Sequence, residues 1–409
     1  MCVRLPFTVA ELPAQAYVVG GWVRDRLLAR ERSLVDLDLV VPTGAIALAS
    51  ELAKRHQAGF VVLDREREIA RVVWLQATMD VAKQVGASLV EDLGHRDFTM
   101  NAMAVPCQSL DAAGNFPVAA VIDPLGGQQD LQEGVVRAIA RENLVADPLR
   151  VLRGYRQAAQ LGFVLEETTR GWLRELAPTL IQVAPERVCM ELCYLLALPT
   201  VGLQRALADG ILAAWLPSSQ LLPERFGAVD GAIAQLLALE PALISYFERV
   251  LAGSRTVTAI TRLAALLRAA TLMQPLHFSK VEHRFCLGIL RHLPKFWEFL
   301  QTEPTPRQRH PLQQATQDTL PAIAALALAS GAEMAAVQPW IGRWLHSSQL
   351  LPVSGDDLQS ALGLRPGPQL GALLTELAIA QAEGQITDRE SALTYSRLWL
   401  PRQVFGKPT

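Results

Sequence analysis

The sequence predicts an α/β head built on a mixed sheet, followed by an all-α neck and body. Over the first 140 residues, short runs rich in β-branched residues alternate with helical patterns, which is typical of one α/β domain. After that point, apolar residues recur at three- and four-residue spacing through most of the chain. The 409 residues, half of them hydrophobic, are enough for several domains that each bury a core. We therefore predict a head over residues 1–140, a neck over 141–200, and a body with a tail over 201–409.

The strands and helices of the head follow from its local patterns. Strands are predicted in "AYVVGG", "LDLVVP", "GFVVLD", "ARVVWL", "TMDVAKQ" and "NAMAVP", which are short and rich in β-forming residues. Between them, "GWVRDRLLA" and "AIALASELAKRHQ" have the apolar spacing of helices.

The neck and body are predicted from longer helical patterns. These are "DPLRVLRGYRQAAQLGF", "PERVCMELCYLLAL", "VGLQRALADGILAAWL" and "AVDGAIAQLLALEPALISYFERVLA". In the first of them, Asp147-Pro148 is a favourable helix start and Gly162 a favourable end. Leu149, Leu152 and Tyr155 are three residues apart and should pack inward.

Composition excludes several classes of protein. The formal charge of −2 favours no particular partner, so a nucleic-acid surface would need local clusters of basic residues. Five scattered cysteines without a C-x-x-C pair argue against a disulfide framework or a zinc site, and a reducing cytoplasm is expected. The N-terminus lacks the pattern of a signal peptide, and no apolar run is long enough to predict a membrane span.

An acidic pair in "LVDLDLVV" is the first candidate for chemistry. Asp36 and Asp38 are two residues apart on a predicted strand, so both carboxylates should project from the same face. Two adjacent carboxylates repel unless a cation lies between them, and Mg²⁺ prefers such oxygen ligands together with substrate phosphates. The alternative is an edge strand with two ordinary surface aspartates.

The residues that precede the acidic pair favour the metal interpretation. Gly20-Gly21 follows a predicted strand and allows the backbone to approach a phosphate closely, and Arg24 lies one helical turn further on. Asp80, on another predicted strand in "ATMDVAKQ", is a candidate third carboxylate. It fits a surface position at a strand end equally well.

These motifs resemble those of a known family. "GGWVRD" followed by "DLDLV" is similar to the signature of the DNA polymerase β nucleotidyltransferase superfamily, and more narrowly to class II tRNA nucleotidyltransferases and poly(A) polymerases. The segment "EDLGHRDFTMNAMAV" resembles the second family motif at Arg96, Asp97 and Asn101, with His95 where the family usually has an arginine. The resemblance implies a polymerase-β-like head. By their chemistry, Arg96 would bind a phosphate, Asp97 would orient Arg96 or a ribose, and Asn101 would hydrogen-bond the sugar of the incoming nucleotide. The alternative is a helix cap with a salt bridge.

The third family motif falls on the predicted helix at 146–163. In the resembling family, its Asp and the next Arg pair with the Watson–Crick edge of CTP or ATP, which implies base selection by Asp147 and Arg150. The later Arg153 and Arg156 would then serve phosphate or ribose. Ala146 stands where the family usually has Glu. Without a nucleotide role, Asp147 would cap its helix and the arginines would form a solvated stripe.

Two further segments resemble the family without implying catalysis. Residues 122–139 correspond to its head-to-neck connector, in which Asp123, Asp130 and Arg137 are predicted to be structural. Residues 184–192 correspond to a later segment, and Glu186, Arg187 and Glu191 are predicted to form salt bridges in the neck.

The resemblance implies Mg²⁺-dependent addition of C, A or both from CTP and ATP to the tRNA 3′ end. In members that build the whole CCA end, a flexible loop lies between the third-carboxylate strand and the second motif. Here Asp80 and Asp92 are only twelve positions apart, as in members that add CC alone, so we predict CC addition and a separate A-adding enzyme. Full CCA addition and A addition remain open, as do a poly(A) polymerase and a non-catalytic RNA-binding protein of the same fold.

Overall fold

The computed structural model describes residues 5–30, 35–345 and 351–404. The chain divides into two compact units, Met1–Ser219 and Gln220–Thr409. The predicted head and neck both fall in the first unit. The division into head, neck and body with tail stays a prediction.

The first unit contains a mixed sheet of six strands, as predicted. The strands are β1 Tyr17–Val19, β2 Val35–Val41, β3 Gly59–Asp64, β4 Ile69–Val73, β5 Ala77–Lys83 and β6 Ala104–Pro106, in the order β3-β4-β5-β2-β1-β6. β2 and β5 are parallel, whereas the other neighbouring strands are antiparallel. Each of the six predicted strand segments overlaps one of these strands, with ends that agree within two residues for β2, β3, β4 and β5.

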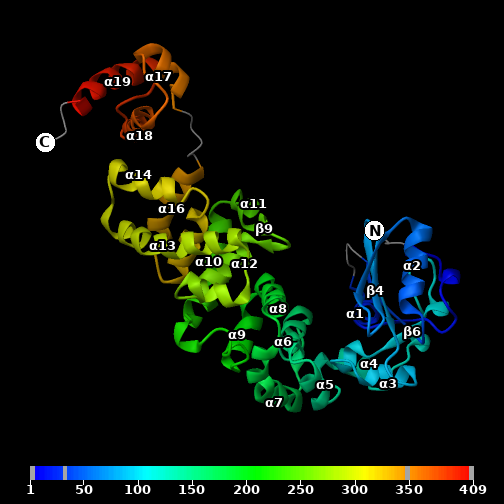
Figure 1. Cartoon of the computed structure of the whole chain (residues 1–409). Coiled ribbons are helices and arrows are strands. Elements are labelled where there is room, and N and C mark those ends of the chain that lie inside the picture. Colours follow the sequence, from blue (N-terminus) through cyan, green and yellow to red (C-terminus); the bar gives the residue numbers. More distant parts are fainter. Residues whose placement is uncertain (1–4, 31–34, 346–350, 405–409) are drawn as a thin grey trace. The chain divides into compact units, whose positions relative to one another are not determined.

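Helices alternate with the strands of this sheet and follow it in the chain. They are α1 Gly21–Leu27, α2 Ala45–His56, α3 Leu89–Gly94 and α4 Gly127–Glu133, and α2 packs against β3, β4 and β5 (Figure 1). The face under α2 carries the buried side chains of β2 and β5, such as Leu37 and Met79, which are partners in the register. The aspartates of β2 alternate with these residues and therefore project from the opposite face.

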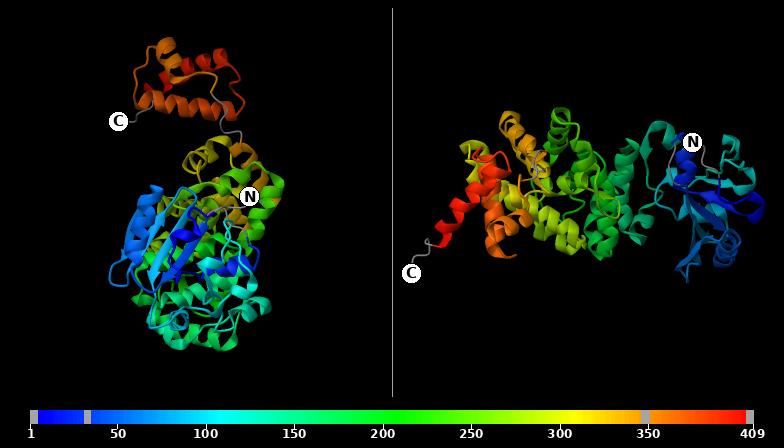
Figure 2. Two further views of the ribbon diagram at one scale, coloured as in Figure 1. Left: turned by 90° about the vertical axis from the view of Figure 1, so that its right-hand side faces the viewer. Right: turned by 90° about the horizontal axis from the view of Figure 1, so that it is seen from above.

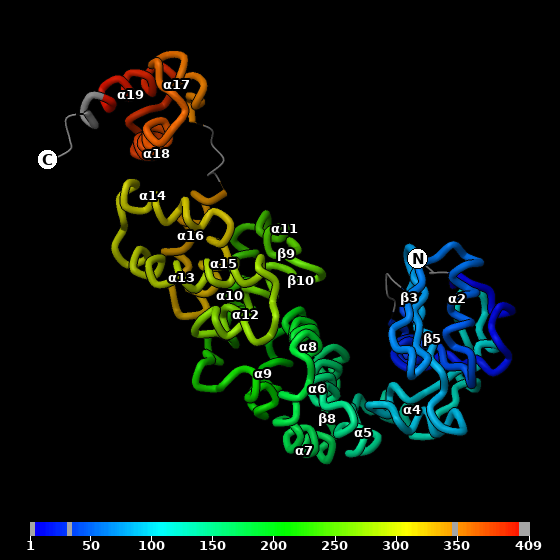
Figure 3. Tube along the Cα trace, in the orientation of Figure 1, coloured from blue at the N-terminus to red at the C-terminus, as the bar shows by residue number. Residues whose placement is uncertain are grey.

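Two short parallel strands, β7 Val135–Val136 and β8 Val164–Leu165, pair on either side of α5 and α6 in the sequence; Figure 3 labels β8 beside α5 and α7. The predicted neck region contains α5 Arg141–Ala146, α6 Leu149–Leu161, α7 Glu167–Leu176 and α8 Pro185–Ala197, and α9 Thr200–Ala208 begins at its end. α6 packs against α7, α8 and α9, and its Leu149, Leu152 and Tyr155 are buried as predicted. Gly162 ends α6 with φ +74°.

The second unit is mainly helical (Figure 2). Its first helices are α10 Pro223–Leu239, α11 Leu243–Glu248 and α12 Val257–Leu266, followed by α13 Lys280–Thr302, α14 Pro306–Ala315, α15 Leu320–Ala329 and α16 Met334–Leu345. α15 is apolar on all sides because α10, α12, α13 and α16 surround it.

Two helix predictions were wrong at their C-terminal ends. The helix expected to continue to residue 216 ends at Ala208, where Gly210 (φ +74°) begins a series of turns. The helix expected over 228–252 is interrupted at Pro241, and its end is a strand, β9 Val250–Ala252, paired with β10 Arg255–Thr256. Proline and glycine override apolar spacing at both places.

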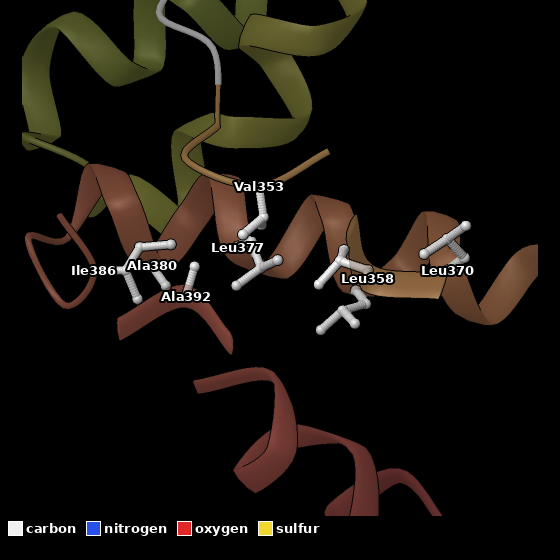
Figure 4. Packing of buried hydrophobic residues seen from close by; sticks show 8 residues of the cluster. Val353, Leu358, Leu370, Leu377, Ala380, Ile386 and Ala392 are labelled. Atoms are coloured by element: carbon white, nitrogen blue, oxygen red, sulfur yellow. The ribbon is translucent and has the colours of Figure 1, made fainter. Parts of the chain in front are cut away.

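The last helices, α17 Gly355–Leu362, α18 Pro368–Ala382 and α19 Arg389–Val404, enclose a small core of their own. Figure 4 shows residues of this core, among them Leu358, Leu377 and Ala392, which come from three different helices. The tail region predicted from sequence is thus a packed structure with a hydrophobic centre.

Among the residues described, four cysteines, namely Cys107, Cys189, Cys193 and Cys286, are buried and form no disulfide bond. Within the same residues, no helix combines the length and the apolar character required to cross a lipid bilayer.

Candidate active site

A cavity of about 770 Å³ in the first unit is lined by the head and by α6 and α8. Every predicted site residue except Asp80 lines it, namely Gly20, Gly21, Arg24, Asp36, Asp38, Arg96, Asp97, Asn101, Asp147, Arg150, Arg153 and Arg156. Residues from three separate sequence motifs therefore meet around one space.

The acidic pair on β2 forms one wall of the cavity. Asp36 and Asp38 lie on the same face, and the Thr78 hydroxyl donates to Asp36 Oδ1 at 2.6 Å. Asp38 is accessible from the cavity, yet the surrounding protein desolvates it and raises its pKa to about 6. The Arg96 guanidinium opposes this rise in pKa, and the charges of Asp80 and Asp36 add to it. Two carboxylates on one face of a strand are suitable ligands for a divalent cation, whose remaining ligands would be phosphate and water.

Asp80 lies beside this pair but is held by another partner. It is directly opposite Asp38 in the parallel register of β2 and β5. Its two oxygens accept hydrogen bonds from Arg71 Nε and Nη2 at 2.6 and 2.8 Å. Over residues 5–30, 35–345 and 351–404, no group of three or more His, Cys, Asp or Glu side chains is arranged to hold a metal ion. The predicted catalytic role of Asp80 stays a prediction.

The glycine turn brings the backbone next to the acidic pair. Gly20 follows β1 with φ +79° and ψ −143°, a conformation that side chains rarely adopt. A Cβ atom at Gly20 would lie 3.1 Å from Asp38 Oδ2 and 3.4 Å from Arg96 Nη1. The absence of a side chain here is what lets Asp38 and Arg96 approach the turn.

Substituting Gly20 with alanine is therefore expected to lower the rate of catalysis, in addition to straining the backbone by about 1–3 kcal/mol. Gly44→Ala is the matched control, because Gly44 also has a positive φ (+72°) but a Cβ atom added there would meet nothing within 4 Å. Measuring nucleotide transfer and thermal unfolding of both variants separates the two effects. Equal losses of activity in the two variants would show that backbone strain alone is responsible.

A buried polar network joins the head to α6. Asp97 Oδ2 accepts hydrogen bonds from Arg153 at 2.8 and 3.1 Å, and Asp97 Oδ1 accepts one from Asn101 Nδ2 at 3.0 Å. The same amide of Asn101 donates to Gln157 Oε1 at 2.8 Å. Burial alone would raise the pKa of Asp97, but Arg153 and these hydrogen bonds lower it to about 2. The carboxylate is therefore ionised and fixes α6 against the head.

The predicted phosphate-binding arginines of the head both have acidic partners. Arg24 is buried and donates to Asp25 Oδ1 at 2.7 and 2.8 Å and to Asn101 Oδ1 at 2.7 Å. Arg96 donates to Asp92 Oδ2 at 3.1 Å. Both guanidinium groups are thus oriented at the cavity wall before any ligand is present.

The predicted base-selecting residues lie where α6 begins. One oxygen of Asp147 accepts a weak hydrogen bond from the Leu149 N–H at 3.3 Å, and the other pairs with Arg187 at 3.0 Å. Arg150 donates to two backbone carbonyl groups, at 3.0 and 3.3 Å. Asp147 therefore uses one oxygen to cap the helix, as the alternative interpretation expected, and its other oxygen bonds a side chain.

Comparisons with known proteins identify the family of this chain. Residues 16–137 match the family model described as poly A polymerase head domain, and residues 162–221 match that of a probable RNA and SrmB-binding site of polymerase A. A Synechocystis protein named CC-adding tRNA nucleotidyltransferase is 41% identical, over 96% of this chain and 96% of its own length. The chain belongs to the tRNA nucleotidyltransferase family. Membership makes it an enzyme of nucleotidyl transfer.

Other members of the tRNA nucleotidyltransferase family match along nearly the whole chain. A Geobacter sulfurreducens protein, also named CC-adding tRNA nucleotidyltransferase, is 32% identical over 96% of this chain and 94% of its own length. The solved structure of a Thermotoga maritima CCA-adding enzyme complexed with tRNA has a TM-score of 0.73 at 20% identity, covering 94% of this chain and 91% of that chain. This likeness confirms the predicted fold of an α/β head followed by helices.

Some residues that line the cavity of this tRNA nucleotidyltransferase were not predicted from the sequence. Gln157, Met190 and Tyr194 all line the cavity, although the sequence indicates only helical packing for them. Gln157 follows Arg153 by four residues and so lies on the same side of α6, and this spacing in the sequence was a signal that could have identified it. The salt bridges predicted for Arg187 and Glu191 are present, with Asp147 and Arg156 as their partners.

Proposed function

We propose that the chain adds two cytidines from CTP to the 3′ end of tRNA, without a nucleic-acid template. The observation that supports this most directly is the convergence of the strand carboxylates, the glycine turn and α6 on one cavity. Its relatives from Synechocystis and Geobacter, which match over almost their full length, bear the name of CC-adding enzymes.

In this proposal Asp36 and Asp38 hold Mg²⁺. When bound, the ion would activate the 3′-hydroxyl and neutralise charge on the α-phosphate and the leaving pyrophosphate. The amide groups at Gly20-Gly21 and the guanidinium of Arg24 hold the triphosphate, for which backbone N–H groups and arginine are suitable donors. Asp80 is proposed as the third carboxylate of the catalytic site, opposite Asp38 in the sheet and paired with Arg71.

The remaining cations serve the phosphate and the ribose of the nucleotide. Arg96 is close to the glycine turn and faces Asp38, which suits a phosphate contact. Asp97 and Asn101 hold the surrounding side chains in place and are proposed to position the sugar. Arg153 and Arg156, which line the cavity from α6, are proposed to contact phosphate or ribose. Because these groups are already hydrogen-bonded to one another, the wall is ordered before the nucleotide arrives.

Base selection is proposed for Asp147 and Arg150. A carboxylate accepts a hydrogen bond from the exocyclic amine of cytosine, and a guanidinium donates to its ring nitrogen or carbonyl oxygen. The present partner of Asp147 is Arg187, whose side chain is 53% exposed, so this ion pair contributes about 1 kcal/mol or less. A base can therefore replace it at small cost.

The CC-adding subtype is proposed from the connection between β5 and α3. Only residues 84–88 lie between these elements, and two of their backbone N–H groups bind side chains of α3. The Val85 N–H donates to Asp92 Oδ1 at 2.9 Å and the Ala87 N–H to Glu91 Oε2 at 2.9 Å, while Ser88 caps the helix. A long flexible loop, associated with the switch from C to A, does not fit between β5 and α3.

Primer extension tests the proposed function. One tRNA transcript would be prepared in three forms, ending before CCA, after C and after CC, and incubated with Mg²⁺ and CTP, ATP or both. We expect the first two forms to be extended to CC and the third to remain unchanged. Complete CCA would show that the short connection does not limit the product, and A addition to the CC form alone would reverse the subtype.

Two controls in the same assay address the other functions. An unstructured RNA with ATP tests for poly(A) synthesis, and its extension in preference to tRNA would contradict the proposal. Absence of all transfer, with tRNA still bound, would indicate a non-catalytic RNA-binding protein. We also propose that the helical second unit binds tRNA, that the enzyme acts in the cytoplasm, and that a separate A-adding enzyme completes the end.

A further inference from the structure

One wall of the cavity has an aromatic surface that the proposed roles do not use. Tyr194 and Met190 lie one turn apart on α8, line the cavity, and are 48% and 54% exposed. Large apolar side chains this exposed inside a polar, arginine-lined cavity indicate a ligand with a flat apolar face.

The ring of Tyr194 is held in place by Arg156. The Arg156 guanidinium carbon lies 5.8 Å from the ring centroid, within the range of a cation–π contact. Arg156 is itself fixed, because it donates to Glu191 Oε2 at 2.5 Å and to Gln160 Oε1 at 2.7 Å. One side of the ring is therefore packed and ordered, while about half of the side chain stays available to a ligand.

The position of Tyr194 along α8 separates it from the base-selecting end of the cavity. Arg187, which pairs with Asp147, precedes Tyr194 by seven residues. At 1.5 Å per residue, this is about 10 Å along the helix axis. Tyr194 therefore lines a different part of the cavity from Asp147, which leaves room for a second base beside the one that Asp147 and Arg150 select.

We propose that Tyr194, supported by Met190, stacks the last unpaired base of the tRNA 3′ end. Unpaired RNA bases are commonly bound by stacking on aromatic side chains, irrespective of their sequence. This arrangement holds the RNA end while CTP occupies the other end of the cavity. The inference rests on the proposed function and names the residue that positions its RNA substrate.

The test compares Tyr194→Leu with Tyr194→Phe, using a tRNA transcript that lacks CCA and therefore ends in one unpaired base. Loss of one stacked base should raise the KM for tRNA by about tenfold or more and leave the KM for CTP unchanged. Tyr194→Phe keeps the ring and should restore most of the affinity for tRNA that Tyr194→Leu loses. Phe60→Leu is the matched control, since this ring is 40% exposed on β3, outside the cavity.

A second substrate makes the test specific for stacking. If the terminal base is removed to leave an abasic site, the wild-type enzyme should lose about as much affinity as Tyr194→Leu does with the intact tRNA. When the abasic tRNA is combined with Tyr194→Leu, the affinity for tRNA should fall little below that of either change alone. Additive losses, a raised KM for CTP, or an unchanged KM for tRNA would each overturn the inference. Failure of the wild type to extend any tRNA would overturn the proposed function together with it.

Discussion

The variant Asp38→Asn is expected to lose at least about a thousandfold in kcat, which corresponds to about 4 kcal/mol in the barrier. Asparagine keeps the shape of the side chain but removes its charge, so one of two proposed metal ligands becomes neutral. Metal-assisted charge stabilisation of a phosphoryl transition state contributes several kcal/mol, which this substitution removes. Asp36→Asn should behave alike, because the two carboxylates lie on the same face of β2.

The experiment should measure single-turnover incorporation of CTP together with binding of tRNA and of Mn²⁺ as a paramagnetic substitute for Mg²⁺. tRNA binding should be retained, whereas Mn²⁺ binding should weaken in both variants. Asp64→Asn is a suitable control, because Asp64 is a carboxylate at the end of β3 outside the cavity. Near wild-type turnover by Asp38→Asn would place the metal site elsewhere and overturn the assignment.

The variant Arg153→Met should destabilise the first unit by about 2 kcal/mol, because it leaves the Asp97 carboxylate buried without its charged partner. Asp97 is only 6% exposed, and the fall of its pKa from 3.8 to about 2 on folding corresponds to a stabilisation of that size. The unfolding transition of the first unit should therefore occur several degrees lower. Arg67→Met is the control, since Arg67 is 81% exposed and lies 3.8 Å from its partner.

The pH dependence of stability provides an independent check on the same ion pair. Because the pKa of Asp97 is lower in the folded state, its stabilisation is fully present above about pH 4 and is lost as the pH falls toward 2. The difference in unfolding free energy between wild type and Arg153→Met should therefore shrink over this interval. A difference that stays constant down to about pH 2 would show that Arg153 stabilises the fold by packing instead of by charge.

The elements of the head could be predicted because their signals are local. The strand with Asp36 and Asp38 has a period of two, so sequence alone indicates which side chains share a face. The ends of longer helices were less predictable, since the apolar spacing continues past Ala208 although the chain turns at Gly210. At this point Gly210, which adopts a positive φ, stops the helix, and the spacing of apolar residues contains no signal for such a stop.

The candidate site could be predicted as a set of residues but not as a set of contacts. Asp97 and Arg153 are 56 residues apart, and only the packing of α6 against the head brings them together. Likewise, the pairing of Asp80 with Arg71 depends on the antiparallel register of β4 and β5. Tyr194 had no sequence signal of its own, because its exposure is a property of the cavity.

The five-residue connection between β5 and α3 has a thermodynamic consequence. The amide groups of Val85 and Ala87 are already bound to Asp92 and Glu91, so this part of the backbone is ordered before a nucleotide enters. Ordering a flexible backbone costs about 1–2 kcal/mol per residue, and this part of the site avoids that loss of entropy. Because the connection between β5 and α3 is already ordered in this way, it has no second conformation to adopt when the RNA end becomes longer. A cavity of this kind favours tight binding of one nucleotide over adaptation to a second.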